Sequence, residues 1–453
     1  MARLFGTDGV RGLANDLLTP ALAVQLGEAA ARVLTRQTPA VKRSRTGRPH
    51  AIVGRDTRAS GEFLDHAISA GLASSGVDVT RVGVLPTPAV AHLTATRDID
   101  LGVMISASHN PFQDNGIKFF ARGGYKLDDA VEDEIEALLG RVEDLPTGAG
   151  VGRVVKGETV ADQNYINHLV DSVATDLTGL RIVVDASNGA ASSVGPAALR
   201  AAGAEVIVIN ASPDGLNINA DCGSTHPARL QSYARSVGAD MGVAYDGDAD
   251  RCLAVDADGK LVDGDQIMGM LAIGMKADGT LGSDTLVVTV MSNLGLILAM
   301  REHGIRTVQT GVGDRYVLER MLQGGYTLGG EQSGHVIDTV HATTGDGVLT
   351  SLHVAARVKR TGKTLAELAS VVTRLPQTLI NVKNVDKGAA STNKAVQDAV
   401  ASAEKDLGET GRVLLRPSGT EPLVRVMVEA ATQEEADRVA RSLAETVKNN
   451  LSL

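Results

Sequence analysis

Three aspartates in the segment DGDADR, residues 246–251, are the side chains best suited to chemistry. The apolar runs MGVAY and CLAV flank this segment, so it is expected at the end of a buried strand. If it is extended, alternate residues point to one side and the carboxylates of Asp246, Asp248 and Asp250 converge. Converging carboxylates repel one another unless a cation joins them, and all-oxygen ligation suits a hard ion such as Mg²⁺. An acidic surface turn is the simpler alternative, and the spacing excludes an EF-hand.

A turn with two serines, within SASHNPFQDNGIKFF at residues 106–120, is the second candidate. It follows the apolar run 101–105, so its serines are expected just past a strand end, where α/β proteins commonly place reactive groups. A serine in this position can act as an exposed nucleophile, and Lys118 is near enough in sequence to steer charge or exchange a proton. The nucleophile elbow G-x-S-x-G is missing from the sequence, so a hydrolase triad is not indicated. A polar turn whose serine caps a helix is the alternative.

Two further segments contain side chains suited to binding a polar ligand. In GGEQSGH, residues 329–335, Glu331 and Ser333 are expected on one side of an extended loop, where they can bind neighbouring hydroxyls. In RPSGTEPLVR, residues 416–425, a turn between two strands can form an anion-binding concavity between guanidinium groups. Its candidate residues are Arg416, Ser418, Gly419, Thr420 and Arg425. A glycine-rich connection and a hairpin with solvated arginines are the alternatives.

The elements that must position these segments follow a repeated plan. Residues 51–84, 181–209 and 285–308 each predict a strand, a loop, a helix and a strand. The fold class is therefore α/β, with three similar mixed-sheet domains. The last part of the chain instead predicts two strands around a tight loop and then a helix that Thr432 and Glu435 open with a capping box, which indicates a smaller α+β domain. The expected domains are residues 1–155, 156–260, 261–372 and 373–453.

Length and charge exclude several classes of protein. A chain of 453 residues is too long for one hydrophobic core, so several domains are expected. The formal net charge of −10 would repel a phosphate backbone, which argues against a nucleic-acid partner. A basic segment at residues 35–50 is interpreted as a surface insertion. No stretch has the roughly 20 apolar residues of a membrane span, and the start of the chain lacks a long apolar region. The expected location is the cytoplasm.

Taken together and in this order, the segments resemble the α-D-phosphohexomutase family across essentially the whole chain. FGTDGVRG at residues 5–12, with Arg11 as a candidate charge partner, and GRDTR at residues 54–58 fit the same pattern. The resemblance implies four domains around a central cleft. The start FGTDGVRG, SASHNP in place of TASHNP, DGDADR in place of DGDGDR, and Gln332 within GEQSGH favour the amino-sugar branch of that family.

The resemblance also implies a role for each matching residue. Ser108 would be a phosphoserine, and one of its oxygens would join Asp246, Asp248 and Asp250 in binding Mg²⁺. Glu331 and Ser333 would bind sugar hydroxyls. The residues of the last domain, namely Arg416, Ser418, Gly419, Thr420 and Arg425, would bind the distal phosphate. Three further residues match positions near the transfer site and are the other catalytic candidates, namely Arg11, Lys118 and His335.

The implied reaction interconverts glucosamine 6-phosphate and glucosamine 1-phosphate through a hexosamine 1,6-bisphosphate, and supplies UDP-N-acetylglucosamine and cell-wall precursor synthesis. The implied partner is a small sugar phosphate, with no nucleic acid and no membrane, and a homodimer is one option that the sequence leaves open. A relative acting on mannose or glucose phosphates is the nearest alternative. More distant alternatives are an aspartyl-phosphate phosphatase or mutase with Asp246 as nucleophile, and a sugar-phosphate sensor without catalysis.

Overall fold

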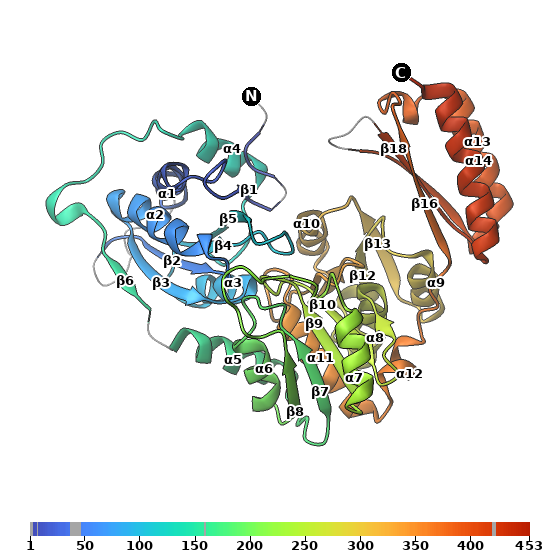
Figure 1. Ribbon diagram of the computed structural model, residues 1–453, viewed down its shortest axis with the longest axis horizontal. Coiled ribbons are helices and arrows are strands. Elements are labelled where there is room, and N and C mark those ends of the chain that lie inside the picture. The colour runs from blue at the N-terminus through green and yellow to red at the C-terminus, as the bar shows by residue number, and fades with distance from the viewer. Residues whose placement is uncertain (1–2, 7, 37–46, 158–159, 419–422) are drawn as a thin grey trace. The chain divides into compact units, whose positions relative to one another are not determined.

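A computed structural model describes residues 3–6, 8–36, 47–157, 160–418 and 423–453 (Figure 1). The chain divides into two compact units, of which the second comprises Ser292–Gly304 and Val371–Leu453 and the first the remainder. The candidate residues Gly419 and Thr420, and residues 37–46 of the basic insertion, lie outside these described ranges. Within them, no helix combines the length and the apolar character that crossing a membrane requires.

The first sheet of the first unit has six strands in the order β1-β5-β4-β2-β3-β6. The pairs β4–β2, β2–β3 and β3–β6 are parallel, whereas β5 runs antiparallel to β4 and β1, so the sheet is mixed. Its strands are β1 (Val10–Leu13), β2 (His50–Arg55), β3 (Asp78–Val84), β4 (Leu101–Ile105), β5 (Asp114–Ala121) and β6 (Val154–Lys156). Its helices are α1 (Pro20–Leu34), α2 (Ser60–Ser74), α3 (Thr87–Thr96) and α4 (Asp129–Ala137).

Helices cover both faces of this sheet, which explains why the middle of β2, residues 51–54, has no polar side chain (Figure 1). Ala51 and Val53 belong to the same buried core as Ile68 of α2. On the opposite face, a Cβ at Gly54 would come within 2.5 Å of Val90 in α3. Successive residues of β2 therefore pack against different helices, and neither set can be polar.

Two further mixed sheets complete the first unit, in the orders β11-β10-β9-β7-β8 and β13-β12-β14-β15. The second sheet has β7 (Arg181–Asp185), β8 (Glu205–Ile209), β9 (Met241–Tyr245), β10 (Cys252–Asp256) and β11 (Leu261–Val262), with α5 (Val160–Val173), α6 (Val194–Ala201) and α7 (Ala228–Ser236). The third has β12 (Thr285–Thr289), β13 (Arg306–Thr310), β14 (Leu328–Gly330) and β15 (Val336–Asp338), with α8 (Gly264–Ala277), α10 (Asp314–Gly324), α11 (Gly347–Thr361) and α12 (Leu365–Ala369).

The three sheets share one feature that positions the candidate residues. In each, a strand of the parallel part is followed directly by an antiparallel neighbour, in the pairs β4–β5, β9–β10 and β14–β15. The serine segment, the aspartate segment and the Glu331 segment are the connections within these three pairs. Each candidate loop therefore starts at the carboxyl end of a parallel strand, where α/β proteins bind ligands.

The second unit contains an antiparallel sheet in the order β16-β18-β17. Its elements are β16 (Gln377–Lys383), β17 (Arg412–Pro417), β18 (Leu423–Glu429), α9 (Leu294–Glu302), α13 (Lys394–Leu407) and α14 (Gln433–Leu451). Although α9 lies between β12 and β13 in sequence, it groups with this unit. The buried Glu429 carboxylate explains why, because it accepts hydrogen bonds from Asn293 Nδ2 (3.1 Å), Leu294 N (3.0 Å) and Arg412 Nε (2.8 Å).

The close packing of α1 on α2 depends on a glycine. A Cβ at Gly71 would lie 2.2 Å from the backbone oxygen of Val24, so the two helices would have to separate. We expect Gly71→Ala to lower the free energy of unfolding by about 1–3 kcal/mol, measured by urea denaturation. In the same helix, a Cβ at Gly61 would meet only the flexible Arg55 side chain at 3.4 Å. Gly61→Ala is the matched control and should cost nothing, and equal losses in both variants would contradict this account.

Candidate active site

The hydroxyl of Ser108 is held beside an aspartate from another sheet. Ser108 follows β4, is buried, and adopts the left-handed region with a φ of +52°. Its Oγ donates to Asp246 Oδ2 at 2.5 Å. The neighbouring Ser106 plays a different part, since its hydroxyl accepts from Ser108 N (2.9 Å) and donates to Asp56 Oδ2 (2.6 Å). Ser106 thus orients the loop, and Ser108 faces the acidic residues. The turn between the two strands ends before Asp114, where β5 begins, so Gly116 lies in the strand.

Arg58 braces the serine loop from within. The side chain is completely buried, and its Nη2 donates to the backbone oxygens of Ser108 (2.9 Å) and Asn110 (2.8 Å). Its Nη1 donates to the oxygens of Asp114 (3.0 Å) and Pro111, and its Nε to Asp56 (2.8 Å). One guanidinium group therefore fixes four carbonyls of the loop. The sequence analysis noted GRDTR but assigned it no role. Hydrogen bonds from an arginine to backbone carbonyls depend on the path of the backbone, so no pattern of residue types in the sequence reveals them.

The three aspartates converge as expected, but for a different reason. Asp246, Asp248 and Asp250 are buried, and each offers a carboxylate oxygen within 4.8 Å of the others. The segment is a turn, with Ala249 at a φ of +56°, and not the extended strand end that the sequence suggested. In the same turn, Gly247 packs against the serine loop, and a Cβ there would lie 2.4 Å from Ser108 O. The turn brings the carboxylates together and also seats them beside the nucleophile.

The electrostatics of the triad show that it lacks balancing charge. Burial and the neighbouring Asp250 and Asp248 raise the pKa of Asp246 well above its usual range. Burial also opposes ionisation of Asp250, but His335, Lys118 and Arg251 outweigh it and hold the pKa of that carboxyl below its usual range. Among the described residues, Oδ1 of Asp248 and Oδ1 of Asp250 are buried without a hydrogen-bond partner. A divalent cation would satisfy both oxygens and remove the repulsion, so these residues fit a metal.

Lys118 and His335 supply positive charge from the first and third sheets. Lys118 Nζ lies 2.7 Å from Asp248 Oδ2 and 2.8 Å from Asp8 Oδ2. Burial lowers the pKa of Lys118, but these carboxylates outweigh it and raise that pKa, so the amine stays charged. His335 lies between two acids, with Nδ1 at 3.6 Å from Asp250 Oδ2 and Nε2 at 3.4 Å from Asp314 Oδ2. Burial lowers the pKa of His335, but these two carboxylates outweigh it and raise that pKa. Arg11 forms an ion pair with Asp8.

Three residues of this charge network were missed by the sequence analysis. Asp8 pairs with Lys118, Arg11 and Lys126. Lys126 in turn pairs with Asp314, which contacts His335. These partners are far apart in sequence, and single Asp and Lys residues are common on surfaces, so no spacing could have identified them. Asp8 lies within the FGTDGVRG segment, which is the one available signal.

Glu331 and Ser333 lie together on the connection between β14 and β15. Ser333 is exposed and its Oγ is 3.4 Å from Glu331 Oε2, while Gly313 N donates to Glu331 Oε1 at 3.1 Å. The residues form a tight turn, closed by a bond from Gly334 N to Glu331 O (3.0 Å), and not the extended loop that was expected. The two side chains nevertheless share a side, as predicted.

In the second unit, Arg416 of β17 and Arg425 of β18 are direct cross-strand partners. Like charges in this arrangement repel, and an anion between them would relieve the repulsion. The turn beyond them begins with Ser418, whose N donates to Leu423 O (2.9 Å) and whose O accepts from Lys387 Nζ (2.7 Å). Gly419 and Thr420 of this candidate site are outside the described residues.

Comparison with known proteins identifies the family. Models of phosphoglucomutase/phosphomannomutase match the α/β/α domains I, II and III at residues 2–145, 163–259 and 263–375, and the C-terminal domain at residues 379–446. A phosphoglucosamine mutase of Bifidobacterium animalis subsp. lactis is 61% identical over 458 residues, which cover 100% of both chains. The chain belongs to the phosphoglucosamine mutase family. It is an isomerase of the phosphohexomutase type.

Solved structures agree on the fold. A phosphoglucomutase/phosphomannomutase family protein of Burkholderia thailandensis has a TM-score of 0.83 at 23% identity, covering 100% of this chain and 99% of that one. An Aspergillus fumigatus N-acetylphosphoglucosamine mutase, solved with GlcNAc-6P and magnesium, has a TM-score of 0.70 at 20% identity, covering 99% and 96%. The predicted fold class, three mixed-sheet α/β domains and a smaller C-terminal domain, is confirmed.

The bracing role of Arg58 can be tested by a substitution that keeps its charge. A lysine cannot reach four carbonyls with one flexible ammonium group, so Arg58→Lys should let the Ser108 loop shift. We expect mutase turnover to fall by about 10²-fold, because small displacements of a nucleophile are costly. Arg55→Lys is the control, since Arg55 pairs with the exposed Glu62. Unchanged turnover of a folded Arg58→Lys variant would refute the role.

Proposed function

We propose that the protein interconverts glucosamine 6-phosphate and glucosamine 1-phosphate through a phosphoryl group carried on Ser108. The observation that carries this proposal is the bond from Ser108 Oγ to Asp246, which joins a buried nucleophile to a cluster of three acids. Such an arrangement suits transfer of a phosphoryl group, because catalysis of that reaction consists mainly of aligning oxygens and neutralising charge. The 61% identity to a phosphoglucosamine mutase supports the choice of sugar.

Asp246, Asp248 and Asp250 would hold Mg²⁺ together with an oxygen of the phosphorylated Ser108. Their unsatisfied carboxylate oxygens and all-oxygen donor set support this assignment, and the Aspergillus relative was solved with magnesium. When bound, the ion withdraws negative charge from the phosphoryl oxygens during transfer.

The residues around Ser108 have separate tasks in the transfer. The 1-hydroxyl of the sugar attacks the phosphorus, the bond from phosphorus to Ser108 Oγ breaks, and the proton that the sugar gives up ends on the departing Ser108 oxygen. The product is a 1,6-bisphosphate. In the return step, Ser108 Oγ takes the phosphoryl group from the other end of that molecule. Lys118 and Arg11 offset the negative charge that develops on the phosphoryl group during transfer. The raised pKa of Lys118 suits it to this task and not to the task of a general base. The nearby Asp250 raises the pKa of His335, which favours a positive charge on its ring for the same purpose.

The intermediate must turn end for end between the two transfers, so one phosphate has to bind away from Ser108. We assign that phosphate to Arg416, Ser418, Gly419, Thr420 and Arg425, and the sugar hydroxyls to Glu331 and Ser333. The partner is accordingly a small, highly charged sugar phosphate, and the cytoplasm is where such a metabolite is retained. The opposed guanidinium groups of Arg416 and Arg425 support the assignment of the phosphate.

Removal of the nucleophile tests the mechanism. We expect Ser108→Ala to reduce turnover by more than about 10³-fold while leaving the fold intact, because the variant lacks the hydroxyl that contacts Asp246 and would carry the phosphoryl group. Mass mapping of the wild-type protein should find phosphate on the peptide that contains Ser108. Ser232→Ala, at an exposed position of α7, is the control. Phosphate on Asp246, or normal turnover of Ser108→Ala, would favour the aspartyl-phosphate alternative.

The sugar is tested separately with one preparation of the phosphorylated protein. We expect kcat/KM for glucosamine 6-phosphate to exceed that for glucose or mannose 6-phosphate by about tenfold or more, as a polar contact to the 2-substituent requires. The three assays share the enzyme, the Mg²⁺ concentration and the direction of transfer. Equal values would leave the mechanism standing but overturn the choice of an amino sugar, and binding of all three without turnover would indicate a sensor.

A further inference from the structure

A second group of titratable side chains lies outside the site described above. Four of the ten histidines, His92, His168, His341 and His353, are joined by ring contacts and one bond to backbone. The rings of His92 and His168 stack with centroids 4.0 Å apart, and those of His341 and His353 meet edge to face at 5.3 Å. The His168 ring hydrogen-bonds to the backbone of His341. The proposed reaction uses none of these rings, so the cluster needs its own explanation.

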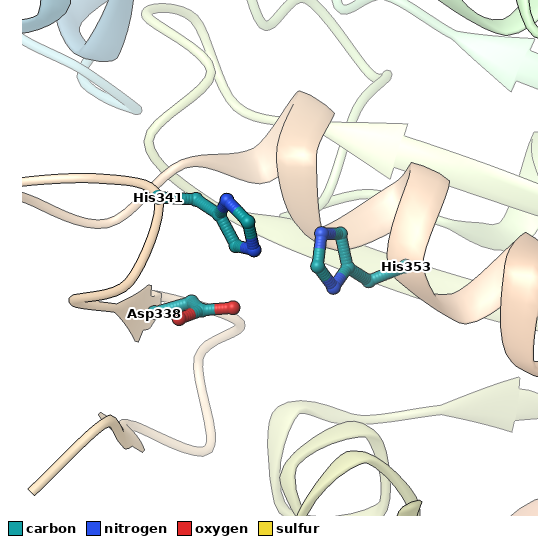
Figure 2. A group of neighbouring side chains, drawn as sticks. All are labelled: Asp338, His341 and His353. Atoms are coloured by element: carbon teal, nitrogen blue, oxygen red, sulfur yellow. The ribbon is translucent and has the colours of Figure 1, made fainter. Parts of the chain in front are cut away.

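Three side chains at one end of this cluster are arranged as metal ligands. Asp338 ends β15, His341 follows it by three residues, and His353 lies on α11. Figure 2 shows the carboxylate and both imidazole rings turned toward one another. Each residue offers one nitrogen or oxygen atom, and these atoms lie within 4.8 Å of one another. All three side chains belong to the first unit.

Neighbouring contacts prepare two of these side chains for an ion. The single hydroxyl proton of Ser172 goes to Leu169 O at 2.6 Å, so the 3.2 Å contact of Ser172 with His353 requires His353 Nε2 to be the donor. The lone pair of His353 is therefore on Nδ1, and a bond of this kind to the second nitrogen is usual for histidine ligands. Val340 N donates to Asp338 Oδ1 at 3.0 Å, which orients the carboxylate. Burial lowers the pKa of His353 to about 3, so the ring is neutral.

A cavity borders one member of the group. It has a volume of about 290 Å³ and reaches His341 between the turn after β15 and the rings of His92 and His168. Asp338 is buried, whereas His341 and His353 are half-buried. An ion would therefore approach the group from the side of His341.

We propose that Asp338, His341 and His353 form a second metal site, which binds a divalent transition ion of the zinc type. Two imidazole nitrogens and one carboxylate oxygen are a ligand set that zinc accepts, with a fourth position left for water. Mg²⁺ prefers oxygen ligands, so the two sites differ in the ion that they select. Tetrahedral zinc places its ligand atoms about 3.3 Å apart, so atoms that lie within 4.8 Å of one another would close by up to about 1.5 Å around it.

Binding of this ion would fasten β15 to α11, because the ligands lie on both elements and on the turn between them. That turn ends at Asp346, which caps α11 by accepting from Leu349 N at 2.9 Å. The site exists only in the folded chain, so the ion stabilises the folded protein by mass action. This inference does not depend on the proposed function.

Zinc binding to the full-length protein tests the site. Equilibrium dialysis is run with a large excess of Mg²⁺ to occupy the aspartate triad, and bound zinc is counted by mass spectrometry. We expect the wild type to bind one more zinc ion per chain than His341→Gln, and zinc to raise the melting temperature of the wild type but not that of His341→Gln. His226→Gln is the matched control, since His226 is exposed on another part of the first unit. It should behave as the wild type does.

Cobalt provides a second readout that reports the ligands directly. Co²⁺ bound by two imidazoles and a carboxylate absorbs visible light far more strongly than Co²⁺ in an octahedral oxygen site. We expect this absorption in the wild type and in His226→Gln, and its loss in Asp338→Asn and in His341→Gln. Equal zinc binding by the wild type and both cluster variants, or no zinc binding beyond the triad, would overturn the proposal. Circular dichroism of each variant confirms that it is folded before the metal is added.

Discussion

The whole arrangement depends on keeping three carboxylates buried within 4.8 Å of one another. Such a cluster is unstable alone, because burial and mutual repulsion both disfavour the charged form. The positive groups that offset it come from all three sheets of the first unit. Lys118 lies on β5, Arg251 directly precedes β10, and His335 directly precedes β15. The folded arrangement of the three α/β domains is therefore a requirement of the triad, and a metal ion bound there would supply the charge that protein side chains leave unbalanced.

The same local plan, repeated three times, delivers the reactive groups to one place. The connections after β4, β9 and β14 each join a parallel strand to its antiparallel neighbour. They also contact one another at glycines, where no side chain would fit. A Cβ at Gly247 would lie 2.4 Å from Ser108 O, and a Cβ at Gly334 would lie 2.4 Å from Cys252 O. Cys252 N also donates to Gly334 O at 2.9 Å, so the aspartate and Glu331 connections are joined by a backbone bond.

Burial explains which parts of this structure could be predicted from sequence. The strands predicted at residues 101–105, 181–185 and 205–209 match β4, β7 and β8, because each contains a run of at least three apolar residues. The grouping of the three aspartates was also predicted, because closely spaced carboxylates repel one another unless a cation joins them. The turn that brings them together was not predicted. The brace from Arg58 and the pairing of Lys126 with Asp8 and Asp314 were missed, because they join residues whose proximity arises only from the tertiary fold.

The segment between β14 and α11 connects both of the sites considered for metal ions. It contains Glu331 and His335 at its start, and then Asp338 and His341. Its packing at His335 leaves little room for adjustment, since a Cβ at Gly345 would lie 2.4 Å from the His335 ring. Two sites are coupled when an element between them has two conformations and each ligand binds one of these conformations more tightly. A segment packed this tightly offers one arrangement, so an ion at Asp338 would strengthen the support of His335 without switching it. The histidine site is thus better suited to stabilising the fold than to regulating turnover.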